Sequence, residues 1–268
     1  MRAVLMAFIV WLSVIQLIAQ QGTSIQNHRS DLTQLLAALR SNDPRIRVGA
    51  FEQIRSASAM LQDSNVQSAL LDLLDLETRE SNARVREGER RRAAHQNDVS
   101  ESSDDNAMYM DDLLGVIESF VDWHDPHQIC LLAKEGAALD APDARESATR
   151  AQVALPCLQQ LSRGELFMER LNAVRTIVAL LKSAGNGLDS NTAEAMRQIV
   201  ILALHDQRVE VQWEAVDSLE QYGRSDMIPV LREFAESSPG PDAPKDEIVV
   251  RKNAAHAITA IQQREAQQ

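Results

Sequence analysis

The fold prediction rests on ERLNAVRTI (169–177), VQWEAVDSL (211–219) and VRKNAAHAI (250–258), together with IRVGAFEQI (46–54) nearer the start of the chain. In each nonapeptide, a long polar residue is followed by Ala three positions later and by Ile or Leu four positions after that. Steps of three and four residues return to the same face of an α-helix. The Ala lets two helix backbones approach closely, and the aliphatic side chain fills the space beside it. The pattern therefore predicts amphipathic helices that pack against one another.

The four nonapeptides recur with a common period. Their polar positions are Arg47, Arg170, Gln212 and Arg251, and the last three are 42 and 39 residues apart. The first gap, 123 residues, is three times 41, which predicts two degenerate copies in between. A period near 40 residues is typical of stacked helix pairs, because one pair cannot bury its own apolar face. We expect the four polar side chains to reach carboxylates or carbonyls of the neighbouring repeat and so to help the repeats stack.

The chain from residue 31 onward is predicted to be all-α. Its apolar residues recur at three- and four-residue steps, and no alternation of period two is sustained, so we place no strands. Because the connections are short, successive helices are expected to lie antiparallel. The expected helices form about six pairs, which are 31–41 with 44–61, 65–78 with 79–95, 109–122 with 126–139, 144–162 with 165–183, 191–205 with 208–222, and 226–237 with 246–264.

Start and stop signals separate the predicted helices. Asp43 and Asp125 each precede a Pro, which suits an N-cap followed by the first helical residue. Asn191 and Glu194 have the spacing of a capping box. Two glycines follow apolar stripes and are expected to take the left-handed conformation of a helix C-terminal cap. They are Gly185 and Gly223.

An Asp-Pro ahead of an Arg-x-x-Ala-x-x-x-Ile helix, repeated with this period, resembles HEAT repeats. The pattern is most similar to the short bacterial HEAT-like repeats related to those of phycobilin lyases. The resemblance covers residues 31–264 and implies an α-solenoid, in which the second helix of each pair lines the concave side. It implies no catalytic residue, because no lyase nucleophile can be carried over to this chain. An irregular helical bundle with chance Ala spacing is the alternative.

Residues 1–19 are predicted to be an export signal or a membrane anchor. Arg2 precedes an apolar run of 13 residues, a length typical of a signal-peptide core, and Ala19 offers a small residue for cleavage. Extended to Ala19, the run reaches the lower limit for a spanning helix. Residues 20–30 are predicted to be a polar tether. We therefore expect a periplasmic or secreted protein or, if the segment is retained, an inner-membrane anchor with a periplasmic domain.

Composition excludes several classes of function. The 268-residue chain carries 27 Lys and Arg against 39 Asp and Glu, a net charge of −12, whereas nucleic-acid-binding proteins are basic. No Gly-rich phosphate loop, Gly-x-Ser-x-Gly elbow or His-Glu-x-x-His helix is present in the sequence. Cys130 and Cys157 lie on apolar stripes, where they either pair in an exported protein or remain buried free thiols.

Two segments depart from the repeat. Residues 77–107 join an Arg-rich stretch to an acidic one, and we expect a charged, partly disordered insertion that is either a docking segment or a solvated loop. Residues 237–246, SSPGPDAPKD, form a Pro-rich loop inside the last pair. This loop is either a passive linker or a contact loop on a binding face.

The stretch DWHDPH (122–127) contains the one cluster in the sequence with metal-ligand chemistry. Its imidazole and carboxylate groups suit a divalent ion, and His124 and His127 are the weak candidates for ligands. The cluster falls at a predicted helix junction, where Asp125 is a natural cap and both histidines can simply be solvated. We therefore predict no metal and no cofactor.

The sequence supports two hypotheses on function. The first is a non-catalytic protein–protein interaction scaffold or adaptor of the bacterial cell envelope, which binds a protein partner on the concave helix face. The second is a lyase-like or metal-dependent enzyme built on HEAT-like repeats, with its site at the His124–His127 junction. We favour the scaffold, because fold analogy alone supplies no reaction.

The candidate partner-binding residues lie in the fifth predicted pair. Four acidic residues recur there at steps of about one helical turn, and such a patch attracts a basic peptide or protein segment. An ordinary solvent-facing helix is the alternative interpretation. The residues are Glu210, Glu214, Asp217 and Glu220.

Overall fold

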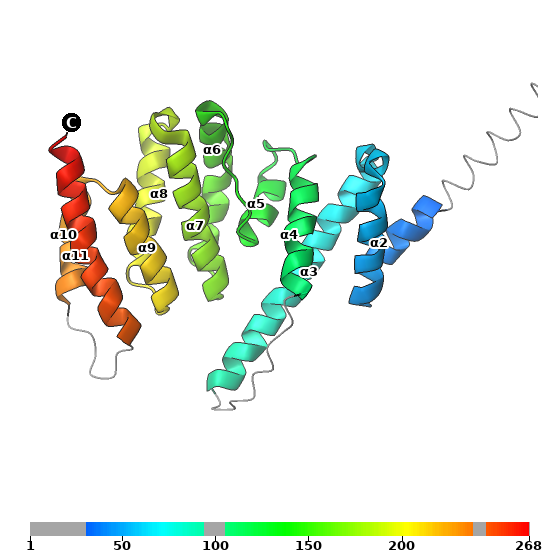
Figure 1. The fold of residues 1–268 in the computed structure, drawn as a ribbon, viewed down its shortest axis with the longest axis horizontal. Helices are drawn as coiled ribbons and strands as arrows, with labels where there is room; N and C mark the ends of the chain where they lie inside the picture. Colours follow the sequence, from blue (N-terminus) through cyan, green and yellow to red (C-terminus); the bar gives the residue numbers. More distant parts are fainter. Residues whose placement is uncertain (1–30, 94–104, 238–244, 268) are drawn as a thin grey trace, which may run out of the picture. The chain divides into compact units, whose positions relative to one another are not determined.

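The computed structural model describes residues 31–93, 105–237 and 245–267. These residues are all-helical and contain no strand, which confirms the all-α prediction (Figure 1). The predicted leader and tether, residues 1–30, lie outside the described residues, as do 94–104 of the charged insertion and 238–244 of the Pro-rich loop. No helix in the described ranges is both long enough and apolar enough to cross a membrane.

Short connections join the helices, and most of them lie within a few residues of the predicted bounds. Residues 31–39 are helical. The helices that follow are α2 (Pro44–Ser56), α3 (Ser64–Ala93), α4 (Asp105–Glu118), α5 (Pro126–Lys134), α6 (Ala144–Leu161), α7 (Phe167–Ala184), α8 (Ser190–Ala203), α9 (Val209–Tyr222), α10 (Ile228–Glu236) and α11 (Lys245–Glu265).

The predicted pair 65–78 with 79–95 is wrong, because α3 is one continuous helix of 30 residues. No Gly or Pro interrupts the sequence near residue 79, and its Glu, Arg and Leu residues favour an unbroken helix. An ion pair one turn apart, between Arg79 and Asp75 at 2.8 Å, crosses the predicted break. The 77–93 part of the predicted insertion is therefore helical.

The described helices belong to two compact units. One unit comprises helix 31–39, α2, α3 up to Leu74, and α4. In its core, Phe51 of α2 and Tyr109 of α4 meet edge to face, with ring centroids 5.4 Å apart. The other unit comprises α3 from Asp75 onward and the described residues from Val121 to the C-terminus.

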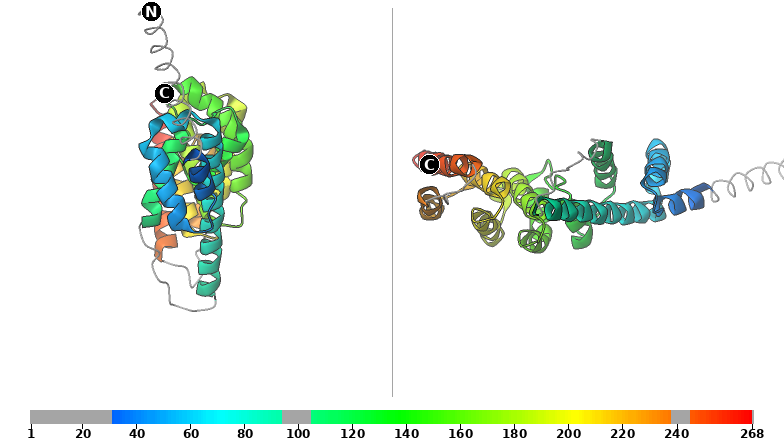
Figure 2. Two further views of the ribbon diagram at one scale, coloured as in Figure 1. Left: turned by 90° about the vertical axis from the view of Figure 1, so that its right-hand side faces the viewer. Right: turned by 90° about the horizontal axis from the view of Figure 1, so that it is seen from below.

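Within the second unit, successive helices alternate between two layers. α6, α8 and α10 lie in one layer, and α7, α9 and α11 lie side by side in the other (Figure 2). α9 contacts α7 and α11 as well as α8. Each helix of this second layer therefore buries part of its apolar surface on a neighbouring pair.

The repeated Ala positions lie where α7, α9 and α11 approach one another. Ala173, Ala215 and Ala254 are fully buried, as expected for positions that let helix backbones come close. The aliphatic positions Ile177 and Leu219 are buried as well, and burial of such a side chain contributes about 1.5–3 kcal/mol. The Ala and aliphatic positions of the repeat in α7 and α9 are thus core positions of the second unit.

Two helices begin as the Asp-Pro signals predict. The Asp43 carboxylate accepts a hydrogen bond from the backbone N–H of Arg45 at 2.9 Å. Asp125 accepts in the same way from the N–H of His127 at 2.8 Å, and this bond lowers the pKa of Asp125. Both caps satisfy donors that the first helical turn leaves without a partner.

The N-cap of α8 differs from the predicted capping box at Asn191. The cap is Asp189, whose Oδ1 accepts from the N–H of Asn191 at 3.0 Å and of Thr192 at 2.9 Å. A carboxylate is favoured here by the positive end of the helix dipole. Hydrogen bonds, those from Thr192 above all, lower the pKa of Asp189 to about 2. Its contribution to stability is therefore complete above the usual pKa of 3.8 and is lost as the pH falls through about 2.

Cys130 of α5 and Cys157 of α6 form a disulfide, with their Cα atoms 5.6 Å apart. Of the two alternatives drawn from the sequence, the structure shows the paired one. The bridge joins residues 27 apart in sequence, and such a cross-link lowers the conformational entropy of the unfolded chain.

Of the two glycines predicted to be left-handed, Gly185 has the expected positive φ of 49°, but its ψ of −126° lies outside the left-handed helical region. The prediction is wrong for Gly223, whose φ is −68°. Close packing requires a glycine there instead. A Cβ at this position would lie 2.4 Å from the carbonyl oxygen of Leu219 and 2.8 Å from Cδ1 of Ile261 on α11.

We therefore predict that Gly223→Ala lowers the free energy of unfolding by about 1–3 kcal/mol, because the added methyl overpacks the contact between α9 and α11. Gly49→Ala is the matched control: it adds the same methyl in α2 where no atom lies within 4 Å. The control is expected to raise stability by about 0.5–1 kcal/mol through helix propensity. Urea unfolding measures both, and equal effects of the two variants would contradict the packing argument.

Candidate functional site

The predicted acidic residues share one face of α9. Glu210, Glu214, Asp217 and Glu220 follow one another at steps of three and four residues, which places them in one row along the helix. Glu210 is exposed, and the other three are half-buried. Because α9 lies between α7 and α11, this row runs along the middle of their layer (Figure 2).

Trp213 lies in the same row and is 39% exposed, which is high for a large apolar side chain. In the register of the repeat it corresponds to Leu171 of α7, which is buried. Trp213 is not among the site residues predicted from the sequence. The sequence feature that could have indicated it is a Trp directly after Gln212, flanked by acidic residues. We call Glu210, Trp213, Glu214, Asp217 and Glu220 the acidic α9 face.

Two carboxylates of the acidic α9 face are paired with arginines. Arg175 of α7 donates to Glu214 at 3.1 Å, and Arg208 donates to Glu210 at 2.9 Å. Asp217 and Glu220 form no ion pair with any residue that the structure describes. The face therefore retains two unneutralised carboxylates beside an exposed aromatic ring.

Three of the predicted stacking residues bind the loop that leads into their own helix. Each of these residues lies four positions after the N-cap of its helix. Its side chain donates a hydrogen bond to the backbone carbonyl of the residue two positions before that N-cap, and we call this arrangement the cap tie. The bonds run from Arg47 to Ser41 O at 3.0 Å, from Arg170 to Gly164 O at 2.9 Å and from Gln212 to Asp206 O at 2.6 Å.

The cap tie also occurs where the sequence analysis did not place it. Gln67 donates to the carbonyl of Leu61 at 2.8 Å, and Ser147 donates to the carbonyl of Ala141 at 3.1 Å. Long and short side chains thus make the same bond when the loop lies at a suitable distance. These five residues share their position relative to the N-cap, and they do not share a residue type.

Arg251, the fourth stacking residue, binds within the last pair. Its Nη1 donates to the carbonyl of Phe234 at 2.7 Å, at the end of α10, and its guanidinium lies 4.9 Å from the centre of the Phe234 ring. Its Nη2 donates to Glu247 at 2.6 Å. The contacts with Phe234 join α11 to α10, whereas the contact with Glu247 lies within α11.

Arg170 makes a contact between pairs. Its Nε and Nη2 donate to both carboxylate oxygens of Asp206, at 2.5 and 3.0 Å, and Asp206 lies in the loop between α8 and α9. The two side chains are only 17% and 8% exposed. A bidentate bond between largely buried partners is strong, because little water competes for either group.

The junction at 122–127 is organised around helix capping. Asp125 caps α5, and Asp122 accepts from the N–H of His124 at 2.9 Å. The imidazole of His124 is largely exposed, with Nδ1 3.5 Å from Asp122. Among the residues that the structure describes, no three His, Cys, Asp or Glu side chains are grouped so as to hold a metal ion. His124 and His127 therefore belong to no such group among these residues.

No protein-family model matches the chain, and a search of curated proteins finds no match.

We predict that Asp206→Asn lowers the free energy of unfolding by about 3 kcal/mol, because Arg170 then keeps its charge in a largely buried site without a carboxylate. Glu214→Gln is the matched control, since it breaks the other ion pair of α7, in which Arg175 is 54% exposed. The control is expected to cost less than about 1 kcal/mol. Thermal unfolding distinguishes them. A loss for Asp206→Asn no greater than for the control would show that the Arg170 contact is not a stabilising link.

Proposed function

We propose that the described helices form a HEAT-like α-solenoid and that the chain is a non-catalytic protein-interaction scaffold. Supporting this are the period near 41 residues, the two helix layers of the second unit and the repeated cap tie. In the proposed arrangement, the layer of α7, α9 and α11 forms the concave, partner-binding side.

The observation that carries the proposal is the acidic α9 face. It presents an exposed indole next to carboxylates that lack an arginine partner. A Lys or Arg of a partner gains a cation–π contact with Trp213 and an ion pair with Asp217 at the same time. The proposed partner is therefore a basic peptide or protein segment, and its binding depends on salt because the charges are partly exposed.

We propose the cell envelope as the site of action. The apolar segment at residues 1–19 suits export, and the Cys130–Cys157 disulfide is typical of an oxidising compartment. The intact mass of the protein recovered from the envelope, with or without residues 1–19, decides between a cleaved signal and a retained anchor. Recovery of reduced, full-length chain from the cytoplasm would contradict the proposal.

The enzyme alternative is not favoured by a specific observation. It depends on the junction that contains His124 and His127, where Asp125 already serves as the cap of α5. We therefore assign no reaction, catalytic residue or cofactor to the chain.

The proposal predicts that a short, labelled, lysine-rich peptide binds the full-length protein and that Asp217→Lys weakens binding about tenfold by replacing attraction with repulsion. Trp213→Ala is expected to weaken it as well, by removing the cation–π contact. Fluorescence anisotropy at two salt concentrations measures both effects.

The matched control for this experiment is Asp111→Lys, which makes the same charge change at an exposed position of α4. Asp111→Lys leaves the net charge equal to that of Asp217→Lys, so only the location differs. Equal losses for the two variants would mean that the peptide responds to overall charge, and the proposal would fail.

A further inference from the structure

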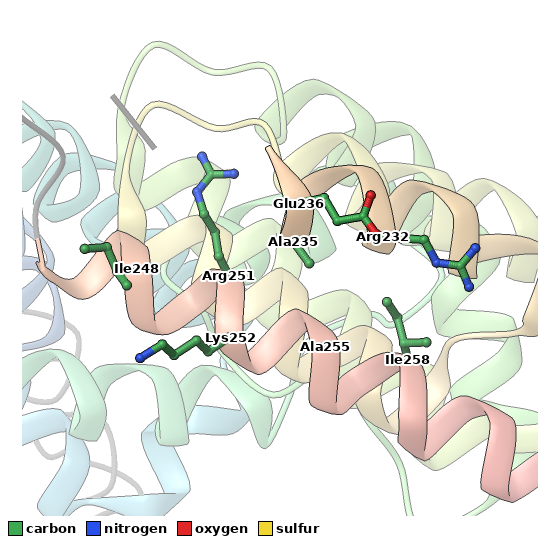
Figure 3. Close-up of a pocket in the computed structure, with 8 residues that line it drawn as sticks. All are labelled: Arg232, Ala235, Glu236, Ile248, Arg251, Lys252, Ala255 and Ile258. Carbon is green, nitrogen blue, oxygen red and sulfur yellow. The ribbon is translucent and has the colours of Figure 1, made fainter. Parts of the chain in front are cut away.

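A groove between α10 and α11 lies apart from the acidic α9 face. Its volume is about 510 Å³, and it follows the two helices of the last pair (Figure 3). Four small or aliphatic side chains and four charged ones line it. They are Ala235, Ile248, Ala255 and Ile258, and Arg232, Glu236, Arg251 and Lys252.

The groove exists because the repeat changes at its last copy. In α7 and α9 the aliphatic positions of the repeat, Ile177 and Leu219, are buried. The same position in α11 is Ile258, which is half-buried and lines the groove. No helix of the described residues covers it.

A second row of the repeat shows the same change. Val174 of α7 and Val216 of α9 are each 1% exposed. The equivalent residue of α11 is Ala255, which is smaller and exposed. Ile248, one turn before Arg251 on the same helix, is 42% exposed. The groove is therefore the place that a further helix would cover.

The charges at the groove indicate what kind of helix this is. Arg251 is already bound to Phe234 and Glu247, but Arg232 and Lys252 form no ion pair or hydrogen bond with any residue that the structure describes. Lys252 lies toward one end of the groove and Arg232 toward the other (Figure 3). The lining carries three cations and one carboxylate, Glu236, so the groove is net positive in a chain whose net charge is −12.

We propose that this groove binds an amphipathic helix of a partner protein that carries acidic residues on the edges of its apolar face. Apolar side chains of the partner cover Ile248, Ala255 and Ile258, and its carboxylates meet Lys252 and Arg232. The lining of α11 runs from Ile248 to Ile258, ten steps of 1.5 Å or about 15 Å, which matches about three turns of helix. This site selects the opposite charge from the acidic α9 face, so it is a second docking site.

A pair of synthetic helical peptides tests the proposal on the purified full-length protein. One peptide has Leu on one face and Glu on the flanking positions, and its twin has Lys in place of every Glu. We expect the Glu peptide to bind at least tenfold more tightly than the Lys peptide in fluorescence anisotropy. Because a lysine-rich peptide is also expected at the acidic α9 face, the two peptides are compared on the Asp217→Lys variant as well. Equal affinities, or preference for the Lys peptide, on that variant would overturn the proposal.

Two variants locate the binding. Ala255→Trp fills the groove and is expected to weaken binding of the Glu peptide more than tenfold. The double change Arg232→Glu with Lys252→Glu is expected to weaken it about tenfold without altering the helices. Arg163→Glu is the control, because Arg163 is an exposed cation outside the groove. No loss in the double variant, or an equal loss per reversed charge in the control, would contradict the assignment.

The same variants distinguish other occupants. If the protein forms a dimer in sedimentation experiments that Ala255→Trp abolishes, the groove binds a second copy and the proposed partner is wrong. If dodecanoate displaces the Glu peptide at equal concentration, the groove is a lipid site and the proposal also fails. Asp217→Lys is expected to leave binding of the Glu peptide unchanged, so this site and the proposed function fail independently.

Discussion

A pair of antiparallel helices cannot hide its own apolar face from water, and the rest of the structure depends on how that face is covered. In the second unit, α9 contacts both α7 and α11, with Ala173, Ala215 and Ala254 fully buried along the layer. Each pair thus buries part of its apolar surface against the neighbouring pairs. The same constraint explains the groove at α10 and α11, where the described chain supplies no further helix and the last aliphatic position of the repeat stays half-buried.

The cap tie, present at α2, α3, α6, α7 and α9, holds the loop that leads into the helix. A side chain four residues after the N-cap holds the carbonyl two residues before it, which orders the loop and satisfies an oxygen that would otherwise need water. Arg170 does this and also binds Asp206, so a single guanidinium links the entry to α7 with the loop before α9. Burial of apolar surface therefore supplies the attraction between pairs, and these hydrogen bonds fix the loops that lead into the helices.

Local signals made most of the fold predictable, and the errors have both local and tertiary causes. Asp43 and Asp125 cap as their Asp-Pro pairs predict, because capping depends only on neighbouring residues. The repeat period predicts a break in α3 near residue 79, but the sequence there contains no helix breaker. The cap rule predicts a left-handed Gly223, whereas a glycine is required there by the space beside the Leu219 carbonyl and beside Ile261, which is far along the chain. Likewise, the four acidic residues on α9 were recognisable by spacing, but the arginine partners of two of them, and the groove, appear only once the helices are packed.

The central claim is that each helix pair in the second unit is stabilised mainly by its contacts with the adjacent pairs. Native-state hydrogen exchange on Ala254→Leu, which overpacks the contact between α11 and α9, tests it most directly. The account predicts that protection falls most in α10 and α11, less in α9, and not measurably in α6. An equal loss of protection in all of these helices would show a single cooperative core and would contradict the account.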